Sequence, residues 1–437
     1  TLTVGVDDTG YDVKFFGATS GDYLLWDESA DTLILHGDMQ TATAGTSNFV
    51  LGVNAGNSIE SGGNYNVAIG DEAATATTTG DYNVAVGYAA LDANTTADYN
   101  VAVGSALSAN TTGAGNTAIG HGSLYANTTA ANNVALGVNA LGTNTTGTPN
   151  TAVGKSALYA NTTGGSNVAV GASALDANTT GNYLTGIGSN ALGGNTTGSN
   201  NTAVGYYALF TNTTGASNTA VGLNTLLLNT TGTNNVAVGE GALDANTTAS
   251  YNIAVGNAAL SANTTAAYNV AIGSSALVTN TTGASNVAVG HAALLSHTTG
   301  TRNNAVGQSA LYTTTTGNYN CAFGYTSLTL NTTANGNSAF GDSSMYTNTT
   351  GASNTAVGMA ALYGNTTAAN NTSVGYYSLF TNTTGANNTA HGFQALYANT
   401  TGSSNTAVGL NTLLLNTTGT GNVAVGEGAL DANTTAA

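Results

Sequence analysis

Residues 150–166 read Asn-Thr-Ala-Val-Gly-Lys-Ser-Ala-Leu-Tyr-Ala-Asn-Thr-Thr-Gly-Gly-Ser, and variants of this 17-residue unit fill most of the chain. The glycine that closes the Asn-x-Ala-Val-Gly segment (the marker glycine) recurs every 17 residues from Gly120 to Gly426. Intervals of 18, 17, 17 and 16 residues separate the markers upstream, which are Gly52, Gly70, Gly87 and Gly104. The chain is therefore a repeat protein of about 22 units, with two one-residue changes of length near its start.

A longer repetition overlies the short one. Residues 218–250 and 405–437 are identical except at Asn234, where the later copy has Gly421, and at Ser250, where it has Ala437. The two copies lie 187 residues apart, which is eleven times 17. Duplication of an eleven-unit block is tolerated only if each unit contacts mainly its neighbours, as in solenoid proteins.

Each unit reads as two short extended segments joined by turn residues. The first is Asn-(Thr/Val)-Ala-(Val/Ile)-Gly, as at residues 167–171, and the second is Ala-Leu-x-x-Asn-Thr-Thr-Gly, as at residues 208–215. Val, Ile and Thr favour strands, whereas Gly, Asn and Ser favour turns. The density of Gly, Thr and Asn disfavours helix, and common helical repeats have longer periods of about 33 residues or more.

We therefore expect an all-β fold in which one unit forms one coil. The fold is a parallel β-solenoid or β-roll of about 22 coils, stacked at the inter-strand spacing of about 4.8 Å. Residues 48–437 form this region. Residues 1–47 contain the only tryptophan, Trp26, and eight of the 20 acidic residues. We expect residues 1–47 to form a small β-rich N-terminal module for attachment or capping.

Stacked coils place equivalent residues above one another in columns. The residue before the marker glycine is apolar, as at Val153, and a leucine follows four residues after the glycine, as at Leu158. We predict that these two columns form the dry core. Two residues before the glycine the side chain is small, as at Ala152, and strand alternation places it on the opposite face. A column this small predicts close approach by another chain, hence a homotrimer around a common axis; a single-chain solenoid is the alternative.

Two asparagine columns accompany the apolar ones. One asparagine opens each unit, as at Asn150, and is replaced only at Leu184; the second begins Asn-Thr-Thr, as at Asn161, and is replaced at His297 and Thr314. Stacked asparagines form amide ladders along a cross-β axis, which is our interpretation of both columns. Each Asn-Thr-Thr is also a sequon for N-glycosylation, but glycans on successive rungs about 4.8 Å apart would collide.

Composition excludes several classes of protein. Charged residues form 5% of the chain, and 20 acidic residues against three basic ones give a net charge of −17. Such a surface repels phosphate backbones, so no nucleic acid is expected as a partner. No apolar run approaches the ~20 residues of a membrane span, and no signal peptide opens the sequence. We expect the chain to be a mature product or a fragment. The single cysteine, Cys321, excludes an intrachain disulfide framework and is predicted to be a buried small residue.

No residues group into a recognisable catalytic, cofactor-binding or metal-binding site, and we expect no enzymatic activity and no cofactor. His391 stands in the apolar column before the marker glycine and is interpreted as a repeat variant. The histidines have no ligand-spaced partners: His36, His121, His291, His297 and His391. A solvated acidic turn is favoured over a calcium site for three carboxylates near the start: Asp7, Asp8 and Asp12.

The residue after the column leucine varies most, and we expect it to be exposed. It is aromatic in some units, as at Tyr125, Tyr159 and Phe210, and acidic in others, as at Asp92 and Asp176. The aromatic members could form a stripe that contacts carbohydrate or another surface. The alternative is that they cap the core or pack between chains.

The recurring Asn-x-Ala-(Val/Ile)-Gly unit resembles the head repeat of trimeric autotransporter adhesins. The fuller unit at residues 150–164, and again at 388–402, resembles repeat regions of tail-fibre-domain proteins from bacteria and phages. Residues 5–17 and 23–27 resemble segments of phage structural and fibre proteins. These resemblances imply a left-handed parallel β-roll of three chains and an extracellular location, on a virion tail fibre or the bacterial cell surface. They also imply a trimerising or self-cleaving chaperone domain beyond Ala437.

The leading functional hypothesis is a fibre segment of a phage tail fibre or bacterial surface adhesin. It would act as a rigid spacer and as a possible element for binding a host-surface glycan or receptor, with its own copies as partners. The alternative is a subunit of a self-assembling extracellular filament. A third class, binding to ice or another crystal surface, requires a flat exposed threonine face.

Overall fold

The computed structural model describes residues 13–16, 23–27, 32–36 and 43–436. These residues contain strands and turns and no helix. The chain divides into two compact units, Thr1–Val138 and Asn139–Ala437, which are considered separately.

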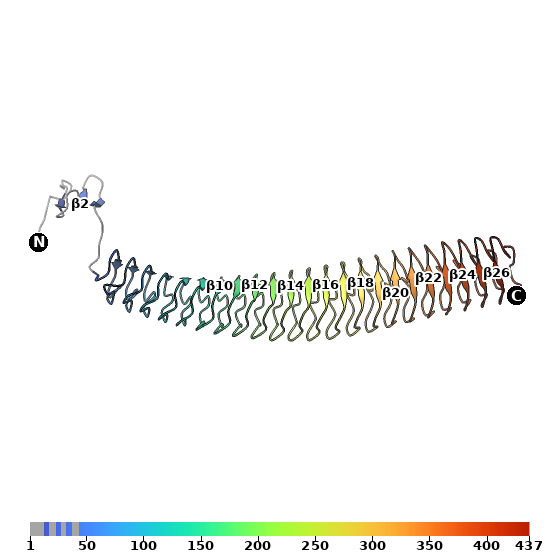
Figure 1. Ribbon diagram of the computed structural model, residues 1–437, viewed down its shortest axis with the longest axis horizontal. Helices are drawn as coiled ribbons and strands as arrows, with labels where there is room; N and C mark the ends of the chain where they lie inside the picture. The colour runs from blue at the N-terminus through green and yellow to red at the C-terminus, as the bar shows by residue number, and fades with distance from the viewer. Residues whose placement is uncertain (1–12, 17–22, 28–31, 37–42, 437) are drawn as a thin grey trace. The chain divides into compact units, whose positions relative to one another are not determined.

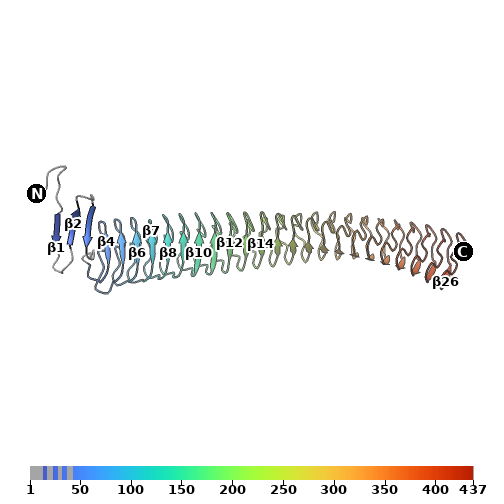
Figure 2. The ribbon, with the colours of Figure 1, turned by 90° about the horizontal axis from the view of Figure 1, so that it is seen from above.

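The first unit contains two kinds of sheet. Three strands near its start pair antiparallel, with Phe15 opposite Leu24 and Leu25 opposite Ile34. They are β1 (Val13–Phe16), β2 (Tyr23–Asp27) and β3 (Thr32–His36). The strands of the repeat region pair parallel and stack in sequence order (Figure 2). They are β4 (Phe49–Leu51), β5 (Val67–Ile69), β6 (Val84–Val86), β7 (Val101–Val103), β8 (Thr117–Ile119) and β9 (Val134–Leu136).

The second unit is a single stack of parallel strands. Each strand pairs with the next in register, so that Ala152 faces Ala169 and Ala169 faces Gly186. In Figure 1 these strands stand one behind another, each followed by a loop that returns around the coil. They are β10 (Asn150–Val153), β11 (Asn167–Val170), β12 (Thr185–Ile187), β13 (Thr202–Val204), β14 (Thr219–Val221), β15 (Val236–Val238), β16 (Ile253–Val255), β17 (Val270–Ile272), β18 (Val287–Val289), β19 (Asn304–Val306), β20 (Cys321–Phe323), β21 (Ser338–Phe340), β22 (Thr355–Val357), β23 (Thr372–Val374), β24 (Thr389–His391), β25 (Thr406–Val408) and β26 (Val423–Val425).

The prediction of a helix-free parallel β-solenoid of about 22 coils, one per 17-residue unit, is confirmed. The boundary between residues 47 and 48 and the role of the N-terminal module stay predictions.

Left-handed backbone conformations turn the chain at the corners of each coil. In the coil that begins at Asn150, three non-glycine residues have positive φ: Ser156 (56°), Leu158 (54°) and Ser166 (57°). Gly154 has φ of 135°, a conformation that only glycine adopts readily. Leucine seldom adopts a positive φ because of its Cβ atom. The fully buried Leu158 side chain offsets that cost with its packing.

The buried core consists of alanine, leucine and asparagine columns and does not include the apolar column before the marker glycine. The strand alanines, the alanine before each column leucine and the leucines themselves are fully buried, as at Ala152, Ala157 and Leu158. The leucine column is therefore in the core, as predicted. The column before the marker glycine is not, because Ile187 and Phe340 are each 40% exposed. Strand alternation was correctly predicted, but the apolar face assigned to the interior was the wrong one.

This correction removes the argument for three chains that rested on the small alanine column. Ala152 and Ala169 have no exposed surface within a single chain. At Gly186, which stands in the same column, an added Cβ atom would lie 3.1 Å from the side chain of Leu175 in the preceding coil, so the column leucines occupy the space beside the alanines. An alanine is small here because the coil is flat, not because a second chain approaches.

Substituting a marker glycine tests how strictly this corner limits the coil. Gly171 has φ of 134°, and a Cβ atom there would lie 2.6 Å from the carbonyl carbon of Gly188. We expect Gly171→Ala to destabilise the adjoining coils by more than about 1 kcal/mol, measured by local hydrogen exchange.

Gly181→Ala is the matched control, because a Cβ atom there would also lie 2.6 Å from the next coil, at the carbonyl oxygen of Gly198, whereas its φ is not in the left-handed region. Alanine occupies the equivalent place in other coils, at Ala249 and Ala266. Equal loss of protection in the two variants would contradict this account of the corner.

Candidate functional site

The asparagine that opens each coil binds two coils together. The side-chain amide of Asn150 donates across its own coil to the carbonyl oxygen of Gly164 (2.9 Å). Its carbonyl oxygen Oδ1 accepts the backbone N–H of Asn167 in the next coil (3.0 Å). The same pair of bonds recurs at Asn167, which donates to Gly181 (2.9 Å) and accepts from Leu184 (2.9 Å). The opening asparagine thus links two parts of its own coil and sets the position of the following strand along the stack.

The asparagine of Asn-Thr-Thr forms a second ladder inside the stack. The Nδ2 atom of Asn161 donates to Oδ1 of Asn144 (2.8 Å), and Asn178 donates in turn to Asn161 (2.9 Å). Asn161 also donates to the carbonyl oxygen of Gly164 (2.9 Å), the oxygen that accepts from Asn150. Two buried amides therefore meet on one backbone carbonyl in this coil, and the arrangement recurs at Gly181 and Gly215. The predicted amide ladders are confirmed.

Burial bears directly on the sequons. Asn161, Asn178 and Asn195 have no exposed surface. Their amides are consumed by hydrogen bonds within the stack. A glycan cannot be attached to a side chain enclosed in this way, so the folded coils do not offer these sequons for modification. The structural interpretation of the column is confirmed.

His297 interrupts the second ladder. Its ring is fully buried, and Nε2 lies 2.7 Å from the carbonyl oxygen of Gly300. Neither Nδ1 of His297 nor Oδ1 of Asn280 in the preceding coil has a hydrogen-bond partner among the described residues. Burial lowers the pKa of His297, and the bond to Gly300 opposes that effect. His297 therefore takes a structural position in the ladder and leaves two buried polar atoms without hydrogen bonds.

The two threonines of each coil have different roles. Oγ1 of Thr162 donates to the carbonyl oxygen of Thr179 in the next coil (3.1 Å), and Thr179 donates likewise to Thr196 (3.0 Å). The second threonine, as at Thr163, is exposed. The first hydroxyl is therefore committed to stacking, and the turn presents one exposed threonine column.

The outer face of the parallel sheet carries an apolar column before the marker glycine and a mixed column after the opening asparagine, where Thr, Ser or Asn stand in ten of the 17 strands from β10 to β26. Residues one and three positions after the opening asparagine point outward, as at Val236 and Val238, and are 37% and 36% exposed. Other members of these two columns in the second unit are exposed to 36–40%: Val168, Ile187, Val221, Ile253, Ile272, Phe323, Phe340 and Val357. We call these two outward columns the sheet face. The column before the marker glycine keeps this face apolar along the second unit except at His391, and an extended exposed apolar surface is typical of an interaction site.

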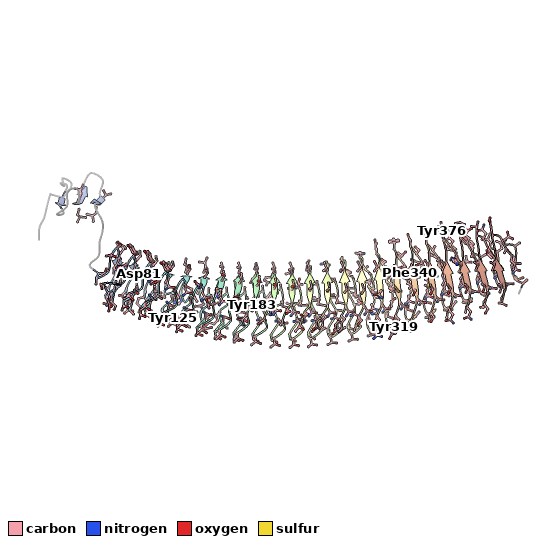
Figure 3. The ribbon with its side chains drawn as sticks, viewed as in Figure 1. Asp81, Tyr125, Tyr183, Tyr319, Phe340 and Tyr376 are labelled. Atoms are coloured by element: carbon pink, nitrogen blue, oxygen red, sulfur yellow. The ribbon has the colours of Figure 1, made fainter. Side chains whose placement is uncertain are left out.

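Outer aromatic side chains stack along the coils. Tyr346 follows Met345, which stands in the leucine column, and Tyr363, Phe380 and Tyr397 follow column leucines. Their successive ring centroids are 5.3, 5.2 and 5.3 Å apart. Other aromatic residues lie elsewhere on the coil, and Tyr319 projects from the edge opposite Tyr376 in Figure 3. Each stacked ring covers the face of its neighbour, so such a stack offers ring edges rather than faces to a ligand.

The remaining single residues do not assemble into a reactive site. His121, His291 and His391 are exposed, whereas the side chain of His36 and the carboxylates of Asp7, Asp8 and Asp12 lie outside the described residues. Cys321 is half-buried rather than buried as predicted, since it points to the outer side of β20, and partial burial raises its pKa. No group of three or more potential ligands for a metal is found in the described segments. Those segments also lack a helix long and apolar enough to cross a membrane.

Comparisons with known proteins found no relative. No protein-family model matches the chain, no curated protein matches it, and no solved structure matches it.

Replacing His297 by asparagine should repair the interrupted ladder. We expect His297→Asn to give Oδ1 of Asn280 a donor and to stabilise the adjoining coils by about 1–2 kcal/mol. Because the buried ring has a lowered pKa, the unfolded chain binds a proton more readily than the folded chain. The stability of these coils should therefore fall as the pH drops below about 6.5, and the substitution should remove that dependence.

Local hydrogen exchange as a function of pH measures both effects. His291→Asn, at an exposed histidine six residues away, is the control and should change neither. An unchanged pH dependence in His297→Asn would show that the buried ring does not determine it.

Proposed function

We propose that this chain is a structural segment of an extracellular fibre, in which the stacked coils act as a rigid spacer. The observation that carries this proposal is the unbroken, in-register pairing of the strands from β10 to β26. Each coil is fixed to the next by backbone pairing, two asparagine columns and a threonine column. Such a stack grows along one axis, because each coil contacts mainly its neighbours.

The dimensions suit a spacer. The second unit has 17 strands in one stack, which at about 4.8 Å per strand corresponds to roughly 80 Å. The interior is occupied by buried side chains, and its asparagine amides are paired within the chain except beside His297, where Oδ1 of Asn280 has no partner among the described residues. Cooperative amide networks of this kind stiffen a structure.

The resemblance of the repeat unit to tail-fibre-domain and adhesin repeats supports a location of the proposed fibre on a virion tail or a bacterial surface. In that setting the chain would hold a recognition element away from the particle or cell. The acidic composition, with a net charge of −17, suits a soluble extracellular surface rather than contact with nucleic acid.

Self-association through the sheet face extends this proposal. A ribbon roughly 80 Å long and about 10 Å wide has an area of about 800 Å², which is what one partner contributes to a standard protein interface. Val221 and Val238 are more than a third exposed in the single chain. Packing of two or three chains face to face would remove these residues from water. A homotrimer or a filament built through this surface replaces the alanine contact that the sequence suggested.

Deleting whole coils tests the spacer role. Removing residues 218–404 takes out eleven units and joins Ser217 to Asn405 in the native pattern. We expect the protein to fold and to become shorter by about 53 Å, measured by electron microscopy. On the particle or cell that carries the fibre, a gold label at the distal end should move inward by that amount.

A deletion that removes half a unit should instead disrupt stacking, because it shifts every column by half a coil. An unchanged label distance after loss of eleven coils would contradict the spacer function.

Charges on the sheet face test self-association. We expect the triple variant Val204→Glu, Val221→Glu, Val238→Glu to convert the oligomer to monomers, because like charges would meet across the interface. Sedimentation equilibrium measures the change. Three substitutions on the exposed threonine column of the same coils, Thr214→Glu, Thr231→Glu and Thr248→Glu, provide the control. A wild-type chain that sediments as a monomer would refute the interface and leave the spacer role standing.

A further inference from the structure

One coil of the first unit is shorter than the rest. Between Gly104 and Ala106 there is only Ser105, whereas two residues separate the marker glycine from the following alanine in the 17-residue units. The corner closes with a hydrogen bond from the N–H of Ala106 to the carbonyl oxygen of Gly104 (2.9 Å). In the regular coil the equivalent bond spans one more residue, from Ala157 to Gly154 (3.2 Å). The shortened corner therefore extends less far outward than the corners of the neighbouring coils.

A hollow of about 410 Å³ lies at this corner. The short coil lines it with small side chains, those of Ser105, Ser108 and Ala109. The coil before contributes Tyr88 and Asp92, and the coil after contributes His121 and Tyr125. Since the two walls are two coils apart, they stand about 9.6 Å from each other. After allowance for the thickness of the wall groups, a gap of roughly 6 Å remains.

Both walls present aromatic surface. Tyr88 is 61% exposed and Tyr125 is 58% exposed, and Tyr125 points away from the coil in Figure 3. Neither ring takes part in a stack with another aromatic side chain among the described residues, unlike the rings farther along the chain. Their faces are thus available to a ligand.

Carboxylates surround one wall. The charge of Glu72, followed by a hydrogen bond from the Tyr88 hydroxyl to Glu72, raises the pKa of Tyr88, and Asp71 and Asp92 add to the effect. Burial raises the pKa of Asp92, and the backbone N–H groups of Asp92 and Ala93 oppose that effect. Its Oδ1 is buried without a hydrogen-bond partner among the described residues. Negative potential at the mouth of an aromatic hollow favours a cation and opposes an anion.

We propose that this hollow binds a small organic ammonium ion of the choline type. A trimethylammonium group, about 6 Å across, fits between the walls and meets the negative face of an aromatic ring, the usual mode of recognition for such ions. The carboxylate of Asp92 supplies the compensating charge. Ser105, whose hydroxyl donates to the backbone oxygen of Tyr88 (3.0 Å), still has lone pairs that accept from the ligand's alcohol. This site does not depend on the spacer role, which needs no hollow.

Titration of the full chain with choline chloride tests the proposal, followed by NMR or calorimetry. We expect a dissociation constant on the order of 0.1–1 mM, the range of a few weak contacts. The uncharged isostere 3,3-dimethylbutan-1-ol should bind at least about tenfold more weakly, because it lacks the charge that the site recognises.

Variants locate the site. Tyr125→Ala and Asp92→Asn should each weaken choline binding about three- to tenfold. Tyr159→Ala and Asp244→Asn alter the same repeat position in regular coils and should have no effect. Inserting one serine after Ser105 restores the 17-residue spacing; we expect it to abolish binding while circular dichroism and local hydrogen exchange remain those of the folded stack.

Three results would overturn the proposal. Equal affinity for choline and its isostere would show that charge is not recognised. Binding of a neutral methyl glycoside instead of choline, lost in Tyr125→Ala, would identify the hollow as a carbohydrate site. Absence of choline binding to the folded wild-type chain would show that the hollow is not a site for an ammonium ion.

Discussion

In most coils that keep both asparagines, one backbone carbonyl inside the stack accepts hydrogen bonds from two buried asparagine amides. At Gly164 the donors are Asn150 and Asn161, each at 2.9 Å. A buried amide that loses its partner costs free energy comparable to a lost hydrogen bond. The two asparagines and the carbonyl must therefore keep their spacing in every coil, and this requirement fixes the length of the repeat. The alanine and leucine columns pack around the pair.

The same arrangement leaves the outside of the coil free to vary. Positions that face outward carry side chains as different as Lys155, Tyr206 and Glu240, because they take no part in the ladders. The two near-identical blocks eleven units apart are compatible with this freedom of the outer positions, since a coil needs only a matching neighbour on each side. The one-residue deletion at Ser105 keeps the bond from Asn110 to Gly113 but leaves Nδ2 of Asn100 buried without a hydrogen-bond partner among the described residues. The strands on either side stay paired, so the surface changes while the stack continues. New binding surfaces can therefore arise on this scaffold at a defect in the repeat.

Much of the fold could be predicted from the sequence, because the period and the residue types in each column determine which residues lie above one another in the stack. The parallel stacking, the amide ladders and the buried Leu158 column followed from these alone. The inner face of the strand did not, because Ala152 and Val153 are both apolar and only the width of the coil decides between them. Cys321, which is half-exposed, was predicted to be buried for the same reason. The hollow at Ser105 was missed because an interval of 16 residues shows a deletion but not which neighbours surround it.

The side-chain amides of asparagine provide the most direct measurement. In a chain labelled with ¹⁵N at asparagine, the NH₂ groups of the two buried columns should exchange with D₂O over hours or longer. The exposed amides of Asn200, Asn234 and Asn370 should exchange at once and serve as an internal reference. The account predicts two well-separated classes of signal. A single class of rapidly exchanging amides in the folded protein would contradict it, because the coils would then be held together by something other than the asparagine ladders.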